Sequence, residues 1–441
     1  VVRTFLPELF GGYVVEGAWL IKVTRDADLD IEQDAAGDLL TLIENKLTRM
    51  HRRSVVRLEY EQGMDETMRL LLAHRLGVGE SDQYGVEGLF TLHDLAGFVE
   101  RISRPGLVWP EATAVEDRDF VVDGPFAAIA TRDRLLFHPW HSYKPVIDFI
   151  TQAADDPAVL AIKQTLYRTS ADSAVIGALE RAARAGKYVS VVVEIKARFD
   201  ERRNIAWARR LEDAGAHVVY GLAGLKTHAK LLLVVRKEPD GIRRYLHLAT
   251  GNYNESTARL YTDFSFFTVD RALGDDVAAV CNMLTGFTWP RSGTRLGVAP
   301  LDCRQKLLAL IGREEENARR GGRGMVRAMM NSLSDRGIIE ALERAASAGV
   351  RIDLIVRGIC LLVPDRNISV RSIVGRYLQH ARVSQFHNGG DEEFYLSSAD
   401  WMTRNLERRV EFLFPVLDAG LRLFLKNTLD LFFRDTLNAW E

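Results

Sequence analysis

The nine residues 178–186 read ALERAARAG, and residues 341–349 repeat them as ALERAASAG, with eight of the nine positions identical. The register then continues without a gap, because the run 191–194 aligns with 354–357. A match that persists through a helix, a turn and a strand is hard to obtain by chance. We therefore predict an internal duplication.

The sequence around the first copy alternates helical periodicity with continuous apolar runs. It predicts a helix over 145–154, a strand over 159–163, a helix over 173–185 that Gly186 ends, and a strand over 188–194. This alternation is typical of an α/β sheet with helices on its faces.

The length of 441 residues is too great for one ordinary core, so several domains are expected. We predict a multidomain α/β and α+β protein, in which an α+β head domain over 1–120 precedes two duplicated α/β catalytic domains over 121–292 and 293–441. Before the first copy we expect a strand over 55–60 and helices over 28–46, 65–76 and 92–102. After it we expect a linker over 290–300 and a helix over 417–440.

The bulk composition is that of an ordinary soluble globular protein. The net charge is −2, so a polyanion must be met by a local concentration of basic residues. Three cysteines without metal-ligand spacing fit a reducing compartment, and we predict a cytoplasmic protein without a signal peptide or a spanning helix. A folded segment follows Val1 at once, so we expect the natural protein to extend beyond this end.

The stretch 224–234, GLKTHAKLLLV, places a histidine and a lysine on one face of a predicted strand. An imidazole can act as a nucleophile near neutral pH, and an ammonium group two residues away stabilises negative charge. Taken alone, the stretch also fits a partly exposed strand that carries two polar residues. The duplication predicts a counterpart, and 375–383 supplies one with His380 and Arg382.

Basic residues gather near both histidines. Those near the first are Arg168, Lys196, Arg198 and Lys230. Those near the second are Arg357, Arg371, Arg376 and Arg382. Guanidinium groups at strand ends grip phosphate oxygens in a bidentate manner. Because the chain has neither a Gly-rich Walker loop nor the kinase signature set, the familiar nucleotide-binding folds are disfavoured.

Long ordered motifs between about residue 130 and residue 415 carry a specific resemblance. They are AIKQTLYR (161–168), KARFDE (196–201), GLKTHAK (224–230), TGNYN (250–254), ARLYTD (258–263), RGIC (357–360) and YLSSADWM (395–402). In these motifs the chain resembles polyphosphate kinase of the first family, whose tandem halves are similar to the phospholipase D fold.

The resemblance implies an ATP:polyphosphate phosphotransferase that uses Mg²⁺, with ATP/ADP and inorganic polyphosphate as its partners and no nucleic acid. It makes His228 the residue that is phosphorylated by ATP and His380 the acid/base partner. It assigns ATP or phosphate binding to Arg168, Arg198, Lys230, Asn252, Tyr261, Arg357 and Arg376. Arg168 and Arg198 match magnesium-site positions, but a guanidinium has no lone pair for a metal, so we expect them to bind phosphate beside the ion. The resemblance also implies a homodimer or homotetramer and allows peripheral membrane association.

The chain departs from the family pattern in several places. The family's N-terminal helical domain is missing from this sequence, and the loop after 363–365 is shorter than usual. Met329 stands where a lysine is expected and Ser369 where an arginine is expected, so both remove positive charge from the expected phosphate path.

Two alternatives remain open from the sequence. A phospholipase D-like phosphodiesterase would use the same two histidines, but Val234 and Val235 occupy the place of its usual aspartate. A catalytically impaired polyphosphate-binding protein would fit the changes at Met329 and Ser369.

Overall fold

The computed structural model has two compact units, Val1–Pro110 and Glu111–Glu441. The described residues are 2–26, 53–92, 95–99, 101–102, 104–110, 112–167, 173–194, 201–222, 224–286 and 295–441. The helix predicted over 28–46 lies outside them, as do Arg168, Lys196 and Arg198.

The first unit is built on a small sheet in the order β1-β2-β3. Its strands are β1 (Ile21–Arg25), β2 (Val55–Glu61) and β3 (Gln83–Val86), and its helices are α1 (Val2–Leu9), α3 (Glu66–Leu76) and α4 (Leu95–Val99). The Asp65 side chain caps α3 by accepting a hydrogen bond from Met68 N at 3.1 Å. The helix predicted over 92–102 is wrong in extent, because among the described residues of that range α4 covers 95–99 and the chain is no longer helical at 101–102; Gly97 lowers its helix propensity.

The first half of the second unit is an α/β layer whose sheet runs β16-β11-β10-β9-β5-β6-β7, with β4 paired to β11. Its strands are β4 (Arg134–His138), β5 (Val159–Leu166), β6 (Tyr188–Val193), β7 (His217–Val219), β8 (Lys226–Thr227), β9 (Lys230–Glu238), β10 (Gly241–Ala249) and β11 (Tyr261–Thr268). Its helices are α5 (Arg118–Val122), α6 (Gly124–Thr131), α7 (Lys144–Asp155), α8 (Ala174–Arg184), α9 (Glu201–Asp213), α10 (Glu255–Ala258) and α11 (Arg271–Gly286).

The second half has a matching sheet in the order β12-β19-β18-β17-β13-β14-β15-β20, with β8 paired to β19. Its strands are β12 (Gly297–Ala299), β13 (Met325–Met330), β14 (Arg351–Val356), β15 (Ile368–Ile373), β16 (Leu378–Gln379), β17 (Val383–Phe386), β18 (Glu393–Ser397), β19 (Arg409–Val416) and β20 (Ala439–Trp440). Its helices are α12 (Cys303–Arg319), α13 (Arg336–Ser347), α14 (Thr403–Arg408) and α15 (Ala419–Arg434). The linker prediction over 290–300 is wrong at its end, where β12 pairs with β19.

The duplication is confirmed by the topology. The parallel pair β5 and β6 flanks α8, the parallel pair β13 and β14 flanks α13, and antiparallel strands extend each sheet on the other side. Ile338, Leu342 and Ala345 lie on one face of α13 and are buried, as expected for a helix that covers a sheet. Gly186 follows α8 with φ +82°, the left-handed conformation in which glycine ends a helix.

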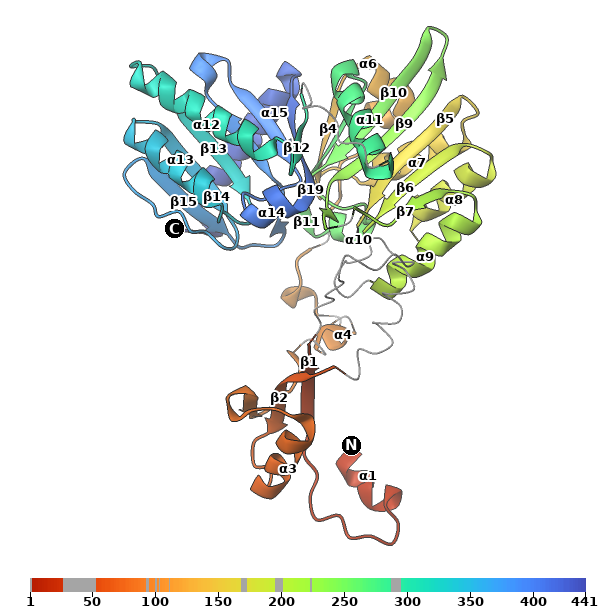
Figure 1. Cartoon of the computed structure of the whole chain (residues 1–441), viewed down its shortest axis with the longest axis vertical. Coiled ribbons are helices and arrows are strands. Elements are labelled where there is room, and N and C mark those ends of the chain that lie inside the picture. Colours follow the sequence, from red (N-terminus) through yellow and green to blue (C-terminus); the bar gives the residue numbers. More distant parts are fainter. Residues whose placement is uncertain are drawn as a thin grey trace. The chain divides into compact units, whose positions relative to one another are not determined.

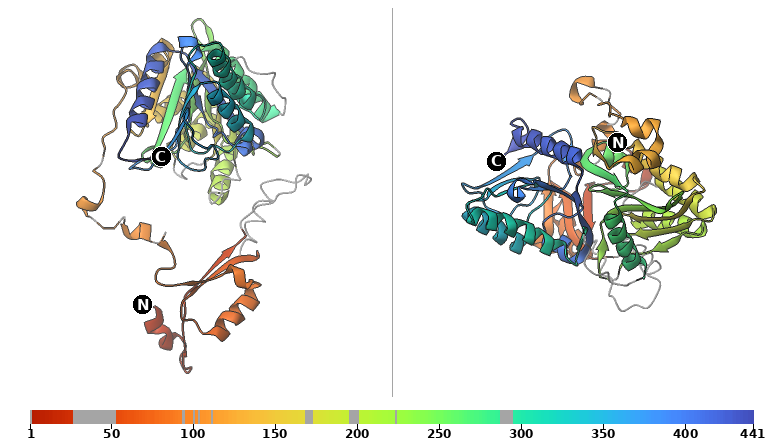
Figure 2. Two further views of the ribbon diagram at one scale, coloured as in Figure 1. Left: turned by 90° about the vertical axis from the view of Figure 1, so that its left-hand side faces the viewer. Right: turned by 90° about the horizontal axis from the view of Figure 1, so that it is seen from above.

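The two halves lie side by side, with β11 and β19 meeting between them and helices on the outer faces (Figures 1 and 2). One continuous cluster of buried apolar side chains from both halves fills this interface. Phe266 stacks on Phe414 across it, with ring centroids 5.8 Å apart. Burial of each such ring contributes about 1.5–3 kcal/mol. None of the helices in the described part of the chain is long and apolar enough to cross a bilayer.

Candidate active site

The stretch around His228 crosses from one half to the other. The prediction of one continuous strand is wrong here: β8 ends at Thr227, β9 begins at Lys230, and the two strands belong to different sheets. Strand β8 pairs in parallel with β19, and the backbone N–H groups of His228 and Ala229 both donate to Val410 O, at 3.0 and 2.9 Å. The second half therefore fixes the backbone of the first histidine.

The second histidine is held in the same way by the first half. Strand β16 ends directly before His380 and pairs in parallel with β11. The His380 N–H donates to Thr262 Oγ1 at 3.0 Å. The backbone of each histidine is therefore held by the opposite half, at positions related by the duplication.

Each histidine also faces a carboxylate from the opposite half. His228 Nδ1 lies 2.9 Å from the Glu411 carboxylate, and His380 Nδ1 lies 2.8 Å from Asp263 Oδ2. An ionised carboxylate only accepts, so opposite it each ring carries its hydrogen on Nδ1 and its lone pair on Nε2, which in His380 lies 3.2 Å from Arg382 Nη1. The Nε2 atoms are therefore the ones available for nucleophilic or acid/base chemistry.

Hydroxyl groups hold the two carboxylates in place. Ser398 Oγ donates to Glu411 at 2.6 Å, and Thr250 Oγ1 donates to Asp263 at 2.6 Å. Such supporting contacts fix the orientation of the imidazole that each carboxylate receives. The buried carboxylates and the hydroxyl groups that hold them therefore fix the orientation of both histidines in advance.

A cation follows each histidine by two residues. Lys230 is 2% exposed and donates to His228 O, while Arg382 donates to His380 O at 2.7 Å. Burial lowers the pKa of Lys230 to about 7. The Arg382 guanidinium also donates two hydrogen bonds to Asp400, from Nε to Oδ1 at 3.3 Å and from Nη2 to Oδ2 at 3.1 Å. Burial alone would raise the pKa of Asp400, but the guanidinium outweighs it and lowers this pKa to about 2.

Replacing Arg382 with lysine is expected to destabilise the protein by about 1–3 kcal/mol, because an ammonium keeps the charge but cannot reproduce the fork onto buried Asp400. The free energy of unfolding in urea measures this. An equal change for Arg336→Lys on the exposed face of α13, where Arg336 pairs only with Glu340, would contradict a special role for the fork.

Two further residues related by the duplication anchor the backbone just before each histidine. Glu194 accepts from Thr227 N at 2.8 Å, and Arg357, its counterpart in the second half, donates to Gln379 O at 2.7 Å. A carboxylate that accepts in the first half and a guanidinium that donates in the second half therefore anchor corresponding backbone positions. Arg357, expected to contact nucleotide, also donates to Asn331 Oδ1 at 2.7 Å.

The other residues expected to bind ATP or phosphate differ in burial and in the side chains that they contact. The Tyr261 ring is 5.3 Å from the His380 ring, and the exposed Arg376 guanidinium lies over Tyr377 at 5.0 Å. The buried amide oxygen of Asn252 faces a small cavity beside Asp263. Arg168 and Arg198 fall outside the described residues, so their roles stay predictions.

Two positions expected near phosphate are placed elsewhere. Arg371 donates to Phe433 O at 2.6 Å and pairs with Glu441 at 2.7 Å, so it holds the C-terminal segment. Met329 is 2% exposed within the interface cluster of apolar side chains. A methionine there fills the core of the interface between the two halves.

Sequence reasoning found the histidines and cations but missed the carboxylates. Asp263 and Glu411 begin the matching segments DFSF (263–266) and EFLF (411–414), in which a single acidic residue interrupts an apolar strand. A buried carboxylate in such a strand needs a partner. This second internal repeat was the signal that could have identified both.

The contribution of Glu411 to the free energy of unfolding is expected to fall as the pH rises from about 4.5 towards 7. Burial raises the pKa of Glu411 from its ordinary 4.5 to about 7. The folded chain therefore keeps a proton that the unfolded chain has released, and this contribution is complete only below pH 4.5. The difference in the free energy of unfolding between the parent and Glu411→Gln, measured by chemical denaturation across pH 4.5–7, isolates this contribution; a difference that does not change with pH would contradict the assignment.

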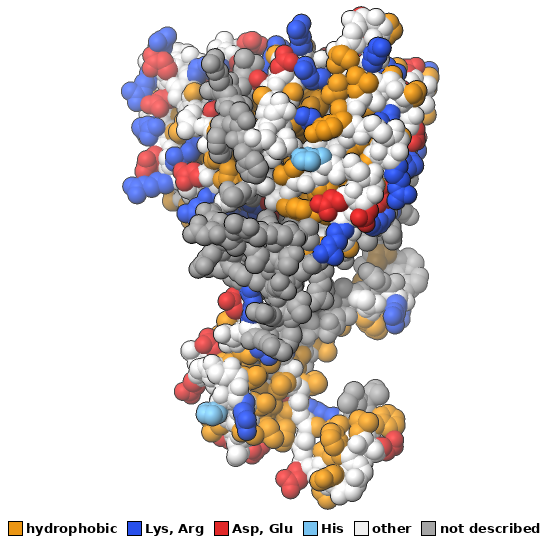
Figure 3. Space-filling model, turned by 45° about the vertical axis from the view of Figure 1, so that its right-hand side comes forward, with side chains coloured by type: hydrophobic (Ala, Val, Ile, Leu, Met, Phe, Trp, Pro, Cys, Tyr) orange, Lys and Arg blue, Asp and Glu red, His pale blue; other side chains and the backbone are white. Residues whose placement is uncertain are grey.

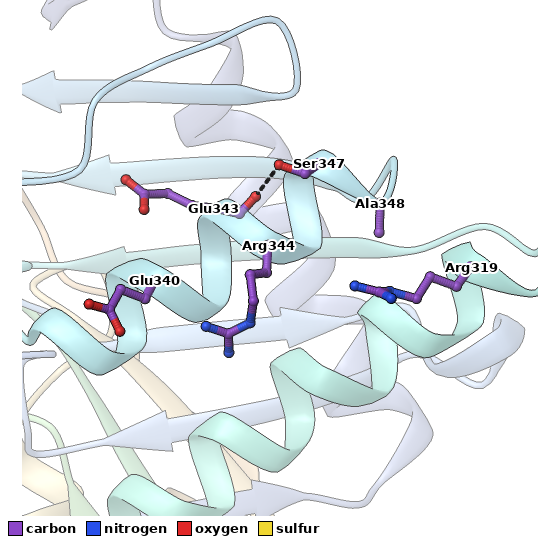
Figure 4. Close-up of a pocket in the computed structure, with 6 residues that line it drawn as sticks. All are labelled: Arg319, Glu340, Glu343, Arg344, Ser347 and Ala348. Atoms are coloured by element: carbon purple, nitrogen blue, oxygen red, sulfur yellow. Dashed lines mark hydrogen bonds between the residues drawn. The ribbon is translucent and has the colours of Figure 1, made fainter.

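Two other surfaces of the larger unit carry both signs of charge. Acidic and basic side chains are mixed over the visible face of the larger unit (Figure 3). A hollow of about 510 Å³ lies between α12 and α13, where Glu340 and Glu343 accompany Arg319 and Arg344 (Figure 4). Its charges are balanced, and none of its lining residues is a histidine.

Comparison with known proteins identifies the family. Three family models match: "Polyphosphate kinase middle domain" over 1–98, "Polyphosphate kinase C-terminal domain 1" over 124–290 and "Polyphosphate kinase C-terminal domain 2" over 296–441. The polyphosphate kinase of Prosthecochloris aestuarii is 46% identical over 99% of this chain, and polyphosphate kinase 1 of Chlorobaculum tepidum is 48% identical over all of it. The chain spans 62% and 64% of the length of these relatives.

A solved structure agrees. The crystal structure of polyphosphate kinase from Porphyromonas gingivalis matches 99% of this chain and 65% of its own length, with a TM-score of 0.84 at 35% identity. The duplicated α/β halves, the histidine pair between them and the family models lead to one conclusion: the chain belongs to the first polyphosphate kinase family.

Proposed function

We propose that this chain performs the reversible transfer of the ATP γ-phosphate to inorganic polyphosphate through a phosphohistidine. The observation that carries the proposal is the reciprocal pairing of His228 with Glu411 and of His380 with Asp263 across the interface. Two such imidazoles at one interface suit an in-line displacement at phosphorus, in which one ring attacks and the other handles a proton on the opposite oxygen. Membership of the polyphosphate kinase family supports ATP and polyphosphate as the substrates.

The first step forms a bond between His228 Nε2 and the γ-phosphorus while the bond from phosphorus to the bridging oxygen breaks. ADP leaves with that electron pair, and a doubly protonated His380 supplies its Nε2 proton to the departing oxygen. Desolvation keeps the pKa of His228 well below its usual 6.5, so the ring stays neutral and nucleophilic. Glu411 compensates the positive charge that develops on the ring.

In the second step a terminal oxygen of polyphosphate attacks the phosphohistidine, and His380 accepts a proton from that oxygen if it carries one. The Nε2–P bond breaks, the chain grows by one phosphate and His228 is restored. The cations Lys230, Arg357 and Arg382 neutralise the charge of the transferred group. With ADP as the acceptor, the same steps in reverse make ATP.

The metal is best treated as part of the substrate. Among the described residues, no group of three or more His, Cys, Asp or Glu side chains could share an ion. The two carboxylates of the site already serve the histidines. Magnesium commonly binds through substrate phosphates with few protein ligands. We propose that Mg²⁺ arrives with ATP, and that Arg168 and Arg198 bind phosphate beside it.

Assays of nucleotide exchange test the proposal. The protein is expected to release ADP while polyphosphate lengthens, and to make ATP from ADP and polyphosphate. A parallel assay with a nucleotide-free phosphodiester should give no turnover. Diester hydrolysis without nucleotide exchange would favour a phosphodiesterase, and retention of polyphosphate without exchange would favour a binding protein.

A further inference from the structure

A cavity of about 10 Å³ lies beside Asp263, the carboxylate that orients His380. Its walls include His138, Tyr143, Asn252 and Ser265. A volume of this size is at the lower limit for one water molecule, which needs two to four polar partners to remain bound.

Two polar atoms of this wall are buried and lack a hydrogen-bond partner in the part of the chain that the structure describes. They are the hydroxyl oxygen of Tyr143 and the amide oxygen of Asn252. The neighbouring polar groups are satisfied: His138 Nδ1 lies 2.9 Å from His141 O, and its Nε2 lies 3.0 Å from Ser265 Oγ. A hydroxyl donor and an amide acceptor therefore border the same small space, and leaving both unpaired would be costly.

Asp263 has capacity for one more donor. Its Oδ1 accepts from Thr250 Oγ1 at 2.6 Å, and both of its oxygens share the His380 Nδ1 hydrogen at 2.8–2.9 Å. An ionised carboxylate offers about four acceptor positions. A donor from the cavity can therefore bind without displacing His380 or Thr250.

We propose that the cavity holds one water molecule that accepts from the Tyr143 hydroxyl and donates to Asn252 Oδ1 and Asp263. Tyr143 and Asn252 are then positioning residues that act on His380 through Asp263. The kinetic part of this inference rests on the proposed function, in which His380 moves the proton. Burial raises the pKa of Tyr143, so its hydroxyl stays protonated and can donate.

This water would also distinguish the two histidines. Burial raises the pKa of Glu411 to about 7, whereas for Asp263 burial is outweighed by His380 and Thr250, and the pKa falls. A further donor from the cavity adds to the stabilisation of the Asp263 anion. An ionised Asp263 suits a histidine that must carry a proton, which is the role assigned to His380.

A crystal structure at about 1.8 Å tests the site directly, without any assay. A density peak is expected in the cavity, within hydrogen-bond distance of Tyr143 Oη, Asn252 Oδ1 and Asp263. The peak should be lost or weakened in Tyr143→Phe, which removes only the hydroxyl. A cavity without density in the parent protein would overturn the proposal.

Kinetics test the positioning role. Tyr143→Phe is expected to lower kcat about tenfold with little change in the KM for ATP, because the water loses a ligand and its hydrogen bond to the charged Asp263 is lost with it. The limb of the pH–rate profile that reports His380 should move to higher pH, because an Asp263 with one donor fewer attracts the imidazolium proton more strongly. Tyr245→Phe is the matched control: it removes a buried hydroxyl that donates to Glu238 at 2.5 Å, and its profile should match the parent's.

Asn252→Ala is the second variant, because it removes the other ligand of the water. If Tyr143→Phe does not fold, Asn252→Ala tests the positioning role in its place. Profiles of these variants that superimpose on the parent's would overturn the positioning role even with a water present. A parent protein without nucleotide exchange would refute the proposed function instead, and the density in the cavity would then decide the water site alone.

Discussion

Replacing His228 with alanine is expected to lower the rate of nucleotide exchange by at least about 10⁴-fold while leaving the fold intact. Among the described residues of the site, His228 combines a free Nε2 with a buried carboxylate on Nδ1 and a buried lysine two residues away. Its loss removes the covalent route, and no neighbouring group in the described site can replace it. Initial rates of ADP release with polyphosphate as acceptor measure the effect.

His387→Ala is the matched control for this experiment. His387 lies after β17 of the second half and takes no part in the paired arrangement, so its loss should leave the exchange rate close to the parent's. Circular dichroism and the melting temperature confirm that both variants are folded. Residual exchange well above about 10⁻⁴ of the parent's rate in a folded His228→Ala would show that another group carries the phosphate.

Replacing Gly251 with alanine is expected to lower kcat by about 10²–10³-fold. A Cβ at this position would lie 2.4 Å from Asp263 Cγ and Oδ2 and 2.8 Å from its Cβ, closer than side chains in proteins approach. Asp263 is held by Thr250 and His380, so it cannot move without disturbing the acid/base histidine. The expected loss is within the range for a misplaced general acid/base.

Gly312→Ala in α12 provides the control for that substitution. No atom lies within 4 Å of its added Cβ, and alanine favours a helix over glycine by about 1 kcal/mol. It should keep full activity and gain slight stability. A Gly251→Ala protein with the parent's kcat would mean that the Asp263 carboxylate tolerates displacement, and it would contradict the preorganised site.

The sequence predicted the fold of each half well, because local signals determine it. The repeated helix at 178–186 and 341–349, with its flanking strands, appears as α8 and α13 between parallel strands. Periodicity could not predict that His228 lies between two strands of different sheets. The partner of β8 is a strand about 180 residues later, as its pairing of Lys226 with Arg409 shows, and no local pattern specifies such a distant contact.

The candidate site, like the fold, was predictable from the sequence only where a local pattern reveals it. The His-x-Lys and His-x-Arg pairs are visible because charged residues are unusual before an apolar strand. Glu411 was not found, since it comes from the opposite half and only the fold brings it to His228. Similarly, the requirement for glycine at 251 depends on the close approach of Asp263, which no spacing in the sequence reveals.

The central claim is that His228 Nε2 carries the phosphate, and mapping the phosphorylated atom tests it most directly. After brief exposure to γ-labelled ATP without an acceptor, the protein should carry an acid-labile, base-stable label on the peptide containing His228. NMR of the phosphorylated peptide should assign the phosphate to Nε2, because Glu411 occupies Nδ1. A label on His380, on a carboxylate or on a hydroxyl, or a label that survives in His228→Ala, would contradict the account.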